Sequence, residues 1–341
     1  MNSRMNGRER LKTIFSGKAA DRCGFWLGCP HADTWPIYLK HFNHPTPDAL
    51  RAFLQDDYAW ICPEWGSYKH PEGKSLWQIS KHSFGEAGPL AACETVQQVD
   101  AFDWPNPDYL DFTDCLAALR GAGDLYRASG MWCSFYHAVM DLFSMEQYFI
   151  KMYTHPDVVE AATRHVCEFY LEANERFFRQ AVSLVDGFFF GNDFGTQLDL
   201  MISPEMFDRF VMPWFRKFTD QGHAHGYQVV LHSCGAIHKV IGRLVDAGVD
   251  ALHPLQARAA DMDAASLARD FKGKIAFLGG IDTQHLLVHG TPADIKADVR
   301  RVKDLLGPCL VVSPSHEALL PNVPPENVLA MAEAAREPSR L

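Results

Sequence analysis

Short apolar runs alternate with amphipathic segments along most of the chain. Eight of these runs are rich in β-branched or aromatic residues and predict strands. Because short apolar strands that alternate with helices pair in parallel, a count of eight predicts a (β/α)8 TIM barrel of the α/β class. The predicted strands cover residues 23–27, 58–62, 130–135, 185–190, 229–231, 249–253, 275–280 and 309–312. A doubly wound open sheet is the alternative, but the chain has no G-x-G-x-x-G or G-x-x-x-x-G-K-[ST] motif to favour it.

Two segments depart from this alternation. Residues 1–20 predict an amphipathic helix, which would form an N-terminal helical extension ahead of the first strand. Residues 66–105 are rich in Gly, Pro, Trp and His and predict an inserted, hairpin-like segment. Long insertions of this kind usually act as lids or binding loops. The remaining pattern fits a single domain over residues 1–341.

The composition is that of an ordinary soluble protein, with 47% hydrophobic and 22% charged residues. A net charge of -10 argues against a nucleic-acid or anionic-membrane partner. The sequence has no apolar run of membrane-spanning length and no apolar signal segment, so we expect a cytoplasmic protein. Nine cysteines without regular spacing fit a reducing compartment in which thiols stay free.

Polar side chains follow nearly every predicted strand. In a (β/α)8 barrel the carboxyl ends of the strands meet on one face and build the active site. We therefore expect these side chains to converge although they are scattered in sequence. They are His31, Glu64, Ser134, His137, Asn192, Asp193, His232, Cys234, His253, Gln256, Asp282, Gln284, His316 and Glu317.

His232 and Cys234 lie two residues apart at the end of the fifth predicted strand, so they share one face of it. An imidazole and a thiolate at this spacing suit Zn²⁺, which accepts nitrogen and sulfur ligands and can keep a position open for chemistry. Gly235 permits a sharp turn into the following helix. The alternative is a core histidine beside a buried free cysteine.

Three motifs together resemble the uroporphyrinogen decarboxylase superfamily, which includes haem-pathway decarboxylases and zinc-dependent cobalamin methyltransferases. They are His232-Ser233-Cys234-Gly235, Gly279-Gly280-Ile281-Asp282, and Pro314-Ser315-His316 followed by Pro324-Pro325-Glu326-Asn327-Val328. The resemblance covers most of the chain, is strongest after residue 185, and implies a single (β/α)8 barrel.

The two branches of the superfamily imply different chemistry. The decarboxylase branch binds a polyanionic porphyrinogen with an arginine-rich segment after the first strand, whereas residues 24–31 contain no arginine here. Arg4, Arg8 and Arg10 lie upstream, on the predicted first helix. A metal-free carboxy-lyase of this branch remains the alternative function, and a non-catalytic binding protein is a third possibility.

The methyltransferase branch fits better. It implies zinc held by His232, Cys234 and a third residue, which local spacing places at His316, with Cys309 as the rival. It also implies a corrinoid (cobalamin), carried by a partner protein, that exchanges a methyl group with a small thiol, methoxy or methylamine compound. Dimers are common in this superfamily, so a homodimer is a further expectation.

The remaining strand-end residues receive supporting roles in this hypothesis. Catalytic or positioning roles go to Asp193, Asp282 and Glu317, with Glu317 a candidate fourth ligand. Substrate binding is assigned to Asn192, Ser134, His137 and Gln284. The competing interpretation treats the carboxylates and Asn192 as helix caps or loop residues, and Ser134 as a small residue that fills the barrel.

Overall fold

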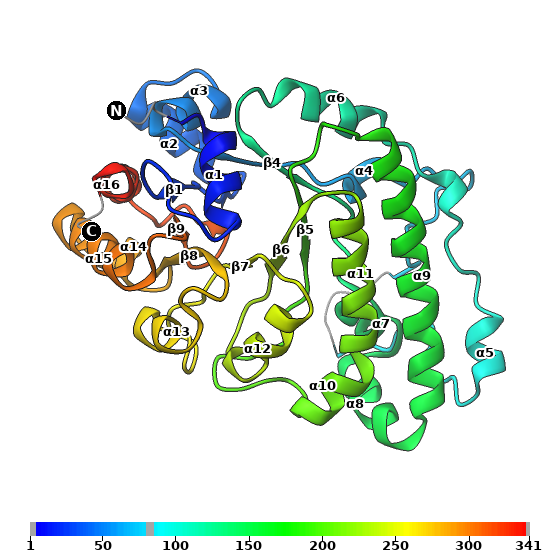
Figure 1. Ribbon diagram of the computed structural model, residues 1–341. Coiled ribbons are helices and arrows are strands. Elements are labelled where there is room, and N and C mark those ends of the chain that lie inside the picture. The colour runs from blue at the N-terminus through cyan, green and yellow to red at the C-terminus, as the bar shows by residue number, and fades with distance from the viewer. Residues whose placement is uncertain (1–4, 80–84, 339–341) are drawn as a thin grey trace.

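The computed structural model describes residues 5–79 and 85–338. Eight parallel strands form one sheet in the order β1-β9-β8-β7-β6-β5-β4-β3, which curves into the predicted (β/α)8 TIM barrel (Figure 1). The strands are β1 (Gly24–Phe25), β3 (Tyr58–Trp60), β4 (Tyr126–Ser129), β5 (Gly187–Gly191), β6 (Gln228–His232), β7 (Ala251–His253), β8 (Ala276–Ile281) and β9 (Leu310–Pro314). A separate parallel pair joins β2 (Cys29–Pro30) to β10 (Ala318–Leu319).

The barrel closes between β1 and β3 through a short seam. The N–H of Asp57 donates to the carbonyl of Phe25 over 2.9 Å, and the Asp57 carboxylate accepts the N–H of Phe25 over 3.0 Å. The same buried carboxylate lies 2.7 Å from Arg10 and 2.8 Å from Arg22. Asp56, which is paired with Arg51, adds a further contact by accepting the N–H of Leu27 over 3.3 Å, so the seam depends on two ion-paired aspartates instead of a run of ladder hydrogen bonds.

Helices cover the outside of the barrel, and several begin at capping residues that the sequence displays. Thr46 accepts the N–H of Ala49 ahead of Pro47, as the start signal of that helix predicts. The longest helix, α9, packs beside α11, and α15 packs on α16 (Figure 1). The helices are α1 (Gly7–Phe15), α2 (Thr34–Phe42), α3 (Pro47–Leu54), α4 (Glu64–Ser67), α5 (Val96–Asp100), η1 (Pro107–Tyr109), α6 (Thr113–Gly121), α7 (Phe135–Phe143), α8 (Met145–Thr154), α9 (Pro156–Gln180), α10 (Pro204–Phe210), α11 (Met212–Ala224), α12 (His238–Asp246), α13 (Ala264–Phe271), α14 (Leu286–His289), α15 (Pro292–Leu306) and α16 (Pro325–Arg336).

The predicted N-terminal helix is α1, and it plugs the amino end of the barrel. Leu11, Ile14 and Phe15 are buried and join the cluster of side chains inside the barrel. Arg8 lies 2.9 Å from the fully buried carboxylate of Asp186. Because the active site of this architecture forms at the other end, α1 contributes to stability and not to the site.

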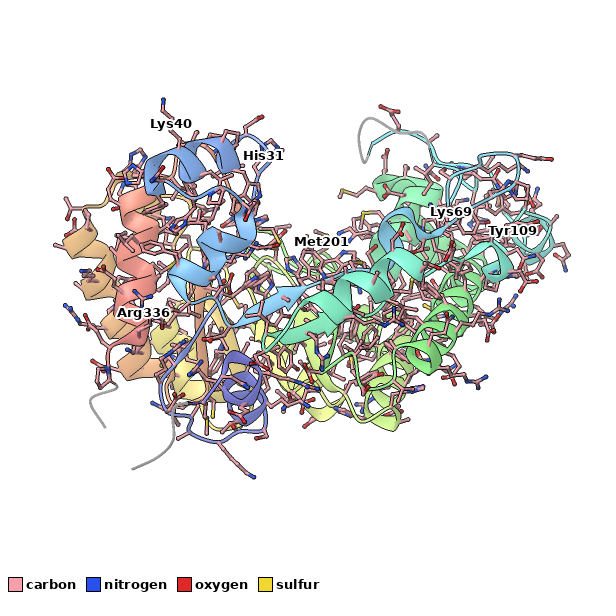
Figure 2. The ribbon with its side chains drawn as sticks, turned by 90° about the horizontal axis from the view of Figure 1, so that it is seen from above. His31, Lys40, Lys69, Tyr109, Met201 and Arg336 are labelled. Carbon is pink, nitrogen blue, oxygen red and sulfur yellow. The ribbon has the colours of Figure 1, made fainter. Side chains whose placement is uncertain are left out.

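The inserted segment over 66–105 differs from the predicted hairpin. Its described residues contain α5, several turns and one antiparallel bridge, between Tyr68 and Leu110 just beyond its end, and residues 80–84 lie outside the described part. Trp77 packs edge-on against Tyr170 of α9, with ring centroids 5.4 Å apart. Seen from above, this side of the molecule, with Lys69 and Tyr109, lies across from His31 and Lys40 (Figure 2).

The third strand is displaced from its predicted position. It covers Tyr126–Ser129, and of the predicted residues 130–135 the first five form a loop that leads into α7, which begins at Phe135. The pattern concealed the strand because it contains Arg127, which is buried through an ion pair with Asp186 at 3.1 Å. The chain then leaves the sheet at Gly130, whose φ of 115° suits glycine.

Candidate functional site

Strand ends on the carboxyl face of the barrel bring together a cluster of His, Cys, Asp and Glu side chains. His232 ends β6 and His253 ends β7, and the two residues are direct partners in the parallel ladder. Val230 and Ala251, two positions earlier, belong to the cluster inside the barrel. Alternation along each strand therefore turns both imidazoles toward the barrel interior at its carboxyl end.

His232 lies at the centre of the cluster. Its Nε2 atom is 3.2 Å from Asp193 Oδ1 and 3.5 Å from Cys234 Sγ. Its Nδ1 atom is 2.9 Å from His253 Nδ1 and 3.6 Å from Glu317 Oε2. The ligand atoms thus form two compact groups, each within 4.8 Å, on the two sides of one imidazole ring.

The loop after β6 is held in place by its backbone. The Asp193 carboxylate accepts the N–H of Cys234 over 2.8 Å, and the Gln256 side-chain oxygen accepts the N–H of Gly235 over 2.7 Å. Gly235 has a φ of +89°, and a Cβ atom there would lie 2.2 Å from the carbonyl oxygen of Gly195. Glycine is therefore required at position 235 for two reasons: the backbone has a positive φ, and there is no room for a Cβ atom.

His316 approaches the cluster from β9, although β7 and β8 separate that strand from β6, but it belongs to neither of the two groups whose ligand atoms lie within 4.8 Å. Its side chain hydrogen-bonds that of Cys234, which raises the pKa of His316. Its Nδ1 atom accepts the N–H of Ala318 over 3.1 Å. Cys309 precedes β9, and its Sγ lies 4.0 Å from the carbonyl oxygen of Lys18, at the opposite end of the barrel. Of the two rivals, His316 is the one beside Cys234.

The electrostatic surroundings favour positive charge at His232. Burial lowers its pKa, but Cys234, Glu317 and Asp193 outweigh burial and raise it well above the ordinary value. Burial raises the pKa of Asp193, but His232 outweighs burial and lowers it well below its usual range. Burial and the neighbouring His232 lower the pKa of His253, which is therefore neutral. A divalent cation at this position would meet the same anionic environment.

The donor set fits a metal ion in its chemistry as well as its charge. Imidazole nitrogen, thiol sulfur and carboxylate oxygen are the ligand types that Zn²⁺ takes in proteins. Two buried atoms of the cluster, His253 Nε2 and Glu317 Oε2, have no hydrogen-bond partner. Buried polar atoms are rarely left unpaired in a folded protein, so these two atoms are a second sign that the cluster receives a ligand.

Aromatic side chains form the wall behind the cluster. The ring of Trp132 lies 5.3 Å from that of His232, and Trp26 lies 5.1 Å from His253. The backbone N–H of Trp132 donates to Glu64 over 2.8 Å, and the hydroxyl of Tyr170 donates to the other oxygen of Glu64 over 3.0 Å. Burial raises the pKa of Glu64 to about 7.

His253, Glu64 and Trp132 had no predicted role in the site. The first two were recognised only as polar residues at strand ends. The signal for His253 was its place as the last residue of the predicted strand 249–253. Trp132 carried no such signal, because a tryptophan after a strand is usually a core residue.

The other predicted residues lie at various distances from the cluster. Asn192 is buried, and its amide binds backbone groups of Tyr136 and Cys133. Asp282 accepts the N–H groups of Gln284 and Leu286 at 2.8 and 3.2 Å at the start of α14. These contacts are of the kind expected if Asp282 is a helix cap and Asn192 a loop residue, as the competing interpretation of the sequence proposed.

Ser134 and His137 lie on the α7 side of the carboxyl face. Ser134 precedes α7 without a side-chain cap hydrogen bond. Burial lowers the pKa of His137, although the carboxylate of Asp193 opposes that effect. Gln284 is exposed and lines a cavity of about 510 Å³ that His316 borders.

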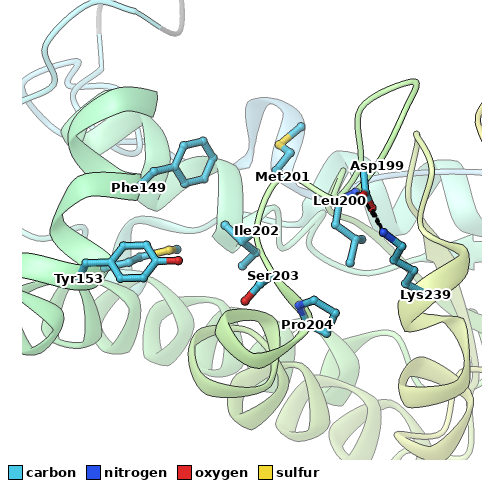
Figure 3. Close-up of a pocket in the computed structure, with 10 residues that line it drawn as sticks. Phe149, Tyr153, Asp199, Leu200, Met201, Ile202, Ser203, Pro204 and Lys239 are labelled. Atoms are coloured by element: carbon cyan, nitrogen blue, oxygen red, sulfur yellow. Dashed lines mark hydrogen bonds and ion pairs between the residues drawn. The ribbon is translucent and has the colours of Figure 1, made fainter.

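A second hollow of about 450 Å³ lies between α8, the loop after β5 and α12 (Figure 3). Tyr153 and Met201 line it, and Lys239 forms an ion pair with Asp199 at 2.6 Å on its side. No residue of the His232 cluster lines this hollow. The cavity beside His316 is therefore the better candidate for a substrate.

Comparison with known proteins places the chain in a family. The profile described as "Uroporphyrinogen decarboxylase (URO-D)" matches residues 136–338, which is more than half of the chain. A search of curated proteins gives no match. A solved structure, a methyltransferase from Methanosarcina mazei, has a TM-score of 0.68 and 17% sequence identity, over 98% of this chain and 99% of that one. Across the described residues, no helix combines the length and apolar character needed to cross a bilayer. The family match covers the loops that carry Asp193, His232, Cys234 and His316, and this chain belongs to the uroporphyrinogen decarboxylase (URO-D) family.

Proposed function

We propose that this protein is a zinc-dependent methyltransferase that moves a methyl group between a corrinoid, carried by a partner protein, and a small thiol, methoxy or methylamine compound. The observation that supports this most is the approach of His232, Cys234 and Asp193 within 4.8 Å, with His316 hydrogen-bonded to Cys234. The shared fold of the Methanosarcina mazei methyltransferase agrees with it.

His232 and Cys234 would hold the zinc ion, with His316 and Asp193 as the candidates for the third ligand. When bound, zinc with an open position supplies a Lewis acid that lowers the pKa of a thiol or polarises an oxygen or nitrogen leaving group. Asp193 fixes the backbone of Cys234 by accepting its N–H. His253 Nδ1 lies 2.9 Å from His232 Nδ1, and this hydrogen bond orients the His232 ring.

The alternative, a metal-free carboxy-lyase acting on a porphyrinogen, needs cations near the barrel mouth. Arg10 is buried and paired with Asp21 and Asp57, and Arg8 is paired with Asp186. These pairs surround α1 at the amino end of the barrel, so neither arginine is available to a polyanion at the carboxyl end.

Zinc analysis of the purified full chain tests the proposal. We expect about one zinc per chain and methyl transfer between methylcobalamin and a small thiol. Cys234→Ser should lose both, because it removes the sulfur ligand. Cys309→Ser is the matched control and should keep both, since Cys309 lies at the other end of the barrel. A zinc-free chain that decarboxylates a porphyrinogen, or a zinc-loaded chain that transfers no methyl group, would contradict the proposal.

A further inference from the structure

The cavity beside His316 has a lining that restricts the charge of any molecule inside it. It has a volume of about 510 Å³ and lies between the ends of β7, β8 and β9 and the segment after β10. Its size is that of a small-molecule site. Ten residues line it: Gln256, Thr283, Gln284, Val288, Ser315, His316, Ala318, Leu320, Asn322 and Val323. We call this cavity the β7–β9 chamber.

The chamber meets the metal-ligand cluster through two of its lining residues. His316 hydrogen-bonds the side chain of Cys234. The Gln256 side-chain oxygen accepts the N–H of Gly235, the residue after Cys234, over 2.7 Å. A small molecule in the chamber is therefore one side chain away from Cys234, which is where a methyl donor or acceptor would have to approach.

Among the residues that the structure describes, the lining offers no fixed charge to a bound ion. Of the ten lining residues, His316 is the only titratable one, and none is Lys, Arg, Asp or Glu. Arg258 lies outside the lining, is about half exposed, and faces Asp282 at 3.6 Å. An anionic substrate would lose hydration without gaining a lysine or arginine partner, and the one titratable side chain of the lining, His316, already faces the Glu317 carboxylate at 3.5 Å.

Within the described part of the chain, the lining also lacks the groups that recognise a methylated ammonium. Proteins bind such cations with aromatic rings that face the charge, or with a carboxylate. The ten lining residues include no Phe, Tyr or Trp and no acidic side chain. An ammonium ion in the chamber would therefore also lack a partner.

The groups that are present suit an uncharged molecule with one polar end. Three amide side chains, Gln256, Gln284 and Asn322, supply both donors and acceptors. Val288 and Leu320 supply apolar surface. This combination of apolar walls and a few polar groups is typical of sites for neutral small molecules.

We propose that the β7–β9 chamber binds a neutral substrate, an uncharged thiol or methyl ether, and selects against both anionic thiols and methylammonium compounds. This inference rests on the proposed methyl transfer for the role of the bound molecule. The charge selection itself depends only on the chamber, so it can be measured separately.

Three probes that share a methoxy group and differ in charge test the inference: 2-methoxyethanol, methoxyacetate and 2-methoxyethylammonium. Their affinities for the purified full chain are measured by ligand-observed NMR, with the zinc content of the same sample recorded. We expect 2-methoxyethanol to bind at least about tenfold more tightly than either ion. Equal or tighter binding of either ion would overturn the inference.

A single substitution tests whether the probes bind in the chamber. Leu320 lines the chamber and is 51% exposed, so Leu320→Arg adds a cation there with little risk to the fold. We expect this variant to bind methoxyacetate about tenfold more tightly than the wild type. The matched control is Leu198→Arg, which adds the same charge at an exposed leucine outside the chamber and should change nothing.

The outcomes separate the two proposals. Neutral selectivity in a chain that binds no zinc would support the chamber inference for binding and refute the proposed methyl transfer. A zinc-loaded chain with methyl transfer that prefers an ionic probe would refute the chamber inference alone. If Leu320→Arg left methoxyacetate affinity unchanged, the chamber would not be the binding site and the inference would fail.

Discussion

The pKa of Glu64 gives the protein a pH-dependent stability that one substitution should remove. Glu64 lies behind Trp132, whose ring packs on His232, and burial raises its pKa to about 7 from an ordinary 4.5. Because the folded pKa is the higher one, this contribution to stability is complete below the unfolded pKa of 4.5 and is lost as the pH rises through about 7. The full loss corresponds to about 3 kcal/mol, and we expect about 2 kcal/mol because the residue is partly accessible.

Urea unfolding of the wild type and Glu64→Gln at about pH 5 and about pH 8.5 measures this loss. Glutamine is neutral at both values, so the variant should become more stable relative to the wild type by about 2 kcal/mol between the two pH values. Glu168→Gln, on the exposed side of α9, is the control and should show no such change. Parallel pH profiles for wild type and Glu64→Gln would refute the reasoning, because they would mean that Glu64 titrates alike in both states.

Three further substitutions test the seam and the site. Asp57→Asn should lower the free energy of unfolding by about 3–5 kcal/mol in urea, because two arginines lose their shared buried partner. Gly28→Ala should reduce zinc content, because the new Cβ atom would lie 2.5 Å from the carbonyl oxygen of Glu317 and would shift that residue of the cluster. Gly17→Ala is the control: Gly17 has a similar positive φ, but its new Cβ atom would point into open space, so zinc content should not change. Asp193→Asn should weaken zinc binding about 10–100-fold in a chelator competition, and unchanged affinity would rule out a role for its charge.

The barrel could be predicted because its signal repeats. Each strand after residue 185 is an apolar run with a helix behind it, so an error at one strand leaves the fold unchanged. The third strand was misplaced because Arg127 is compensated by Asp186, a partner 59 residues away. Hydrophobic periodicity carries no information about such a distant ion pair.

The site was predictable as a place and less so as a set of contacts. The rule that strand ends converge brought His232, Cys234 and Glu317 to one face, and the structure has them there. The rule does not say which side chains will touch. Asp282 turned toward the backbone of α14, whereas Asp193 turned toward His232, and both follow strands in similar sequence surroundings. The difference lies in loop geometry, which a single sequence does not encode in local spacing.

The two nitrogens of His232 belong to different ligand groups, so an ion that binds together with the Cys234 sulfur would take one particular nitrogen. Cys234 and Asp193 face Nε2, so a cation bound with them would take the lone pair of that nitrogen. The proton would then reside on Nδ1, which lies 2.9 Å from Nδ1 of the neutral His253. That atom of His253 must act as the acceptor, so the proton of His253 lies on Nε2, the buried nitrogen without a partner. The Nε2–H group of His253 is therefore left without a hydrogen-bond partner, which costs free energy. In return, the hydrogen bond at Nδ1 fixes the ring of His232, the metal ligand, before the ion binds.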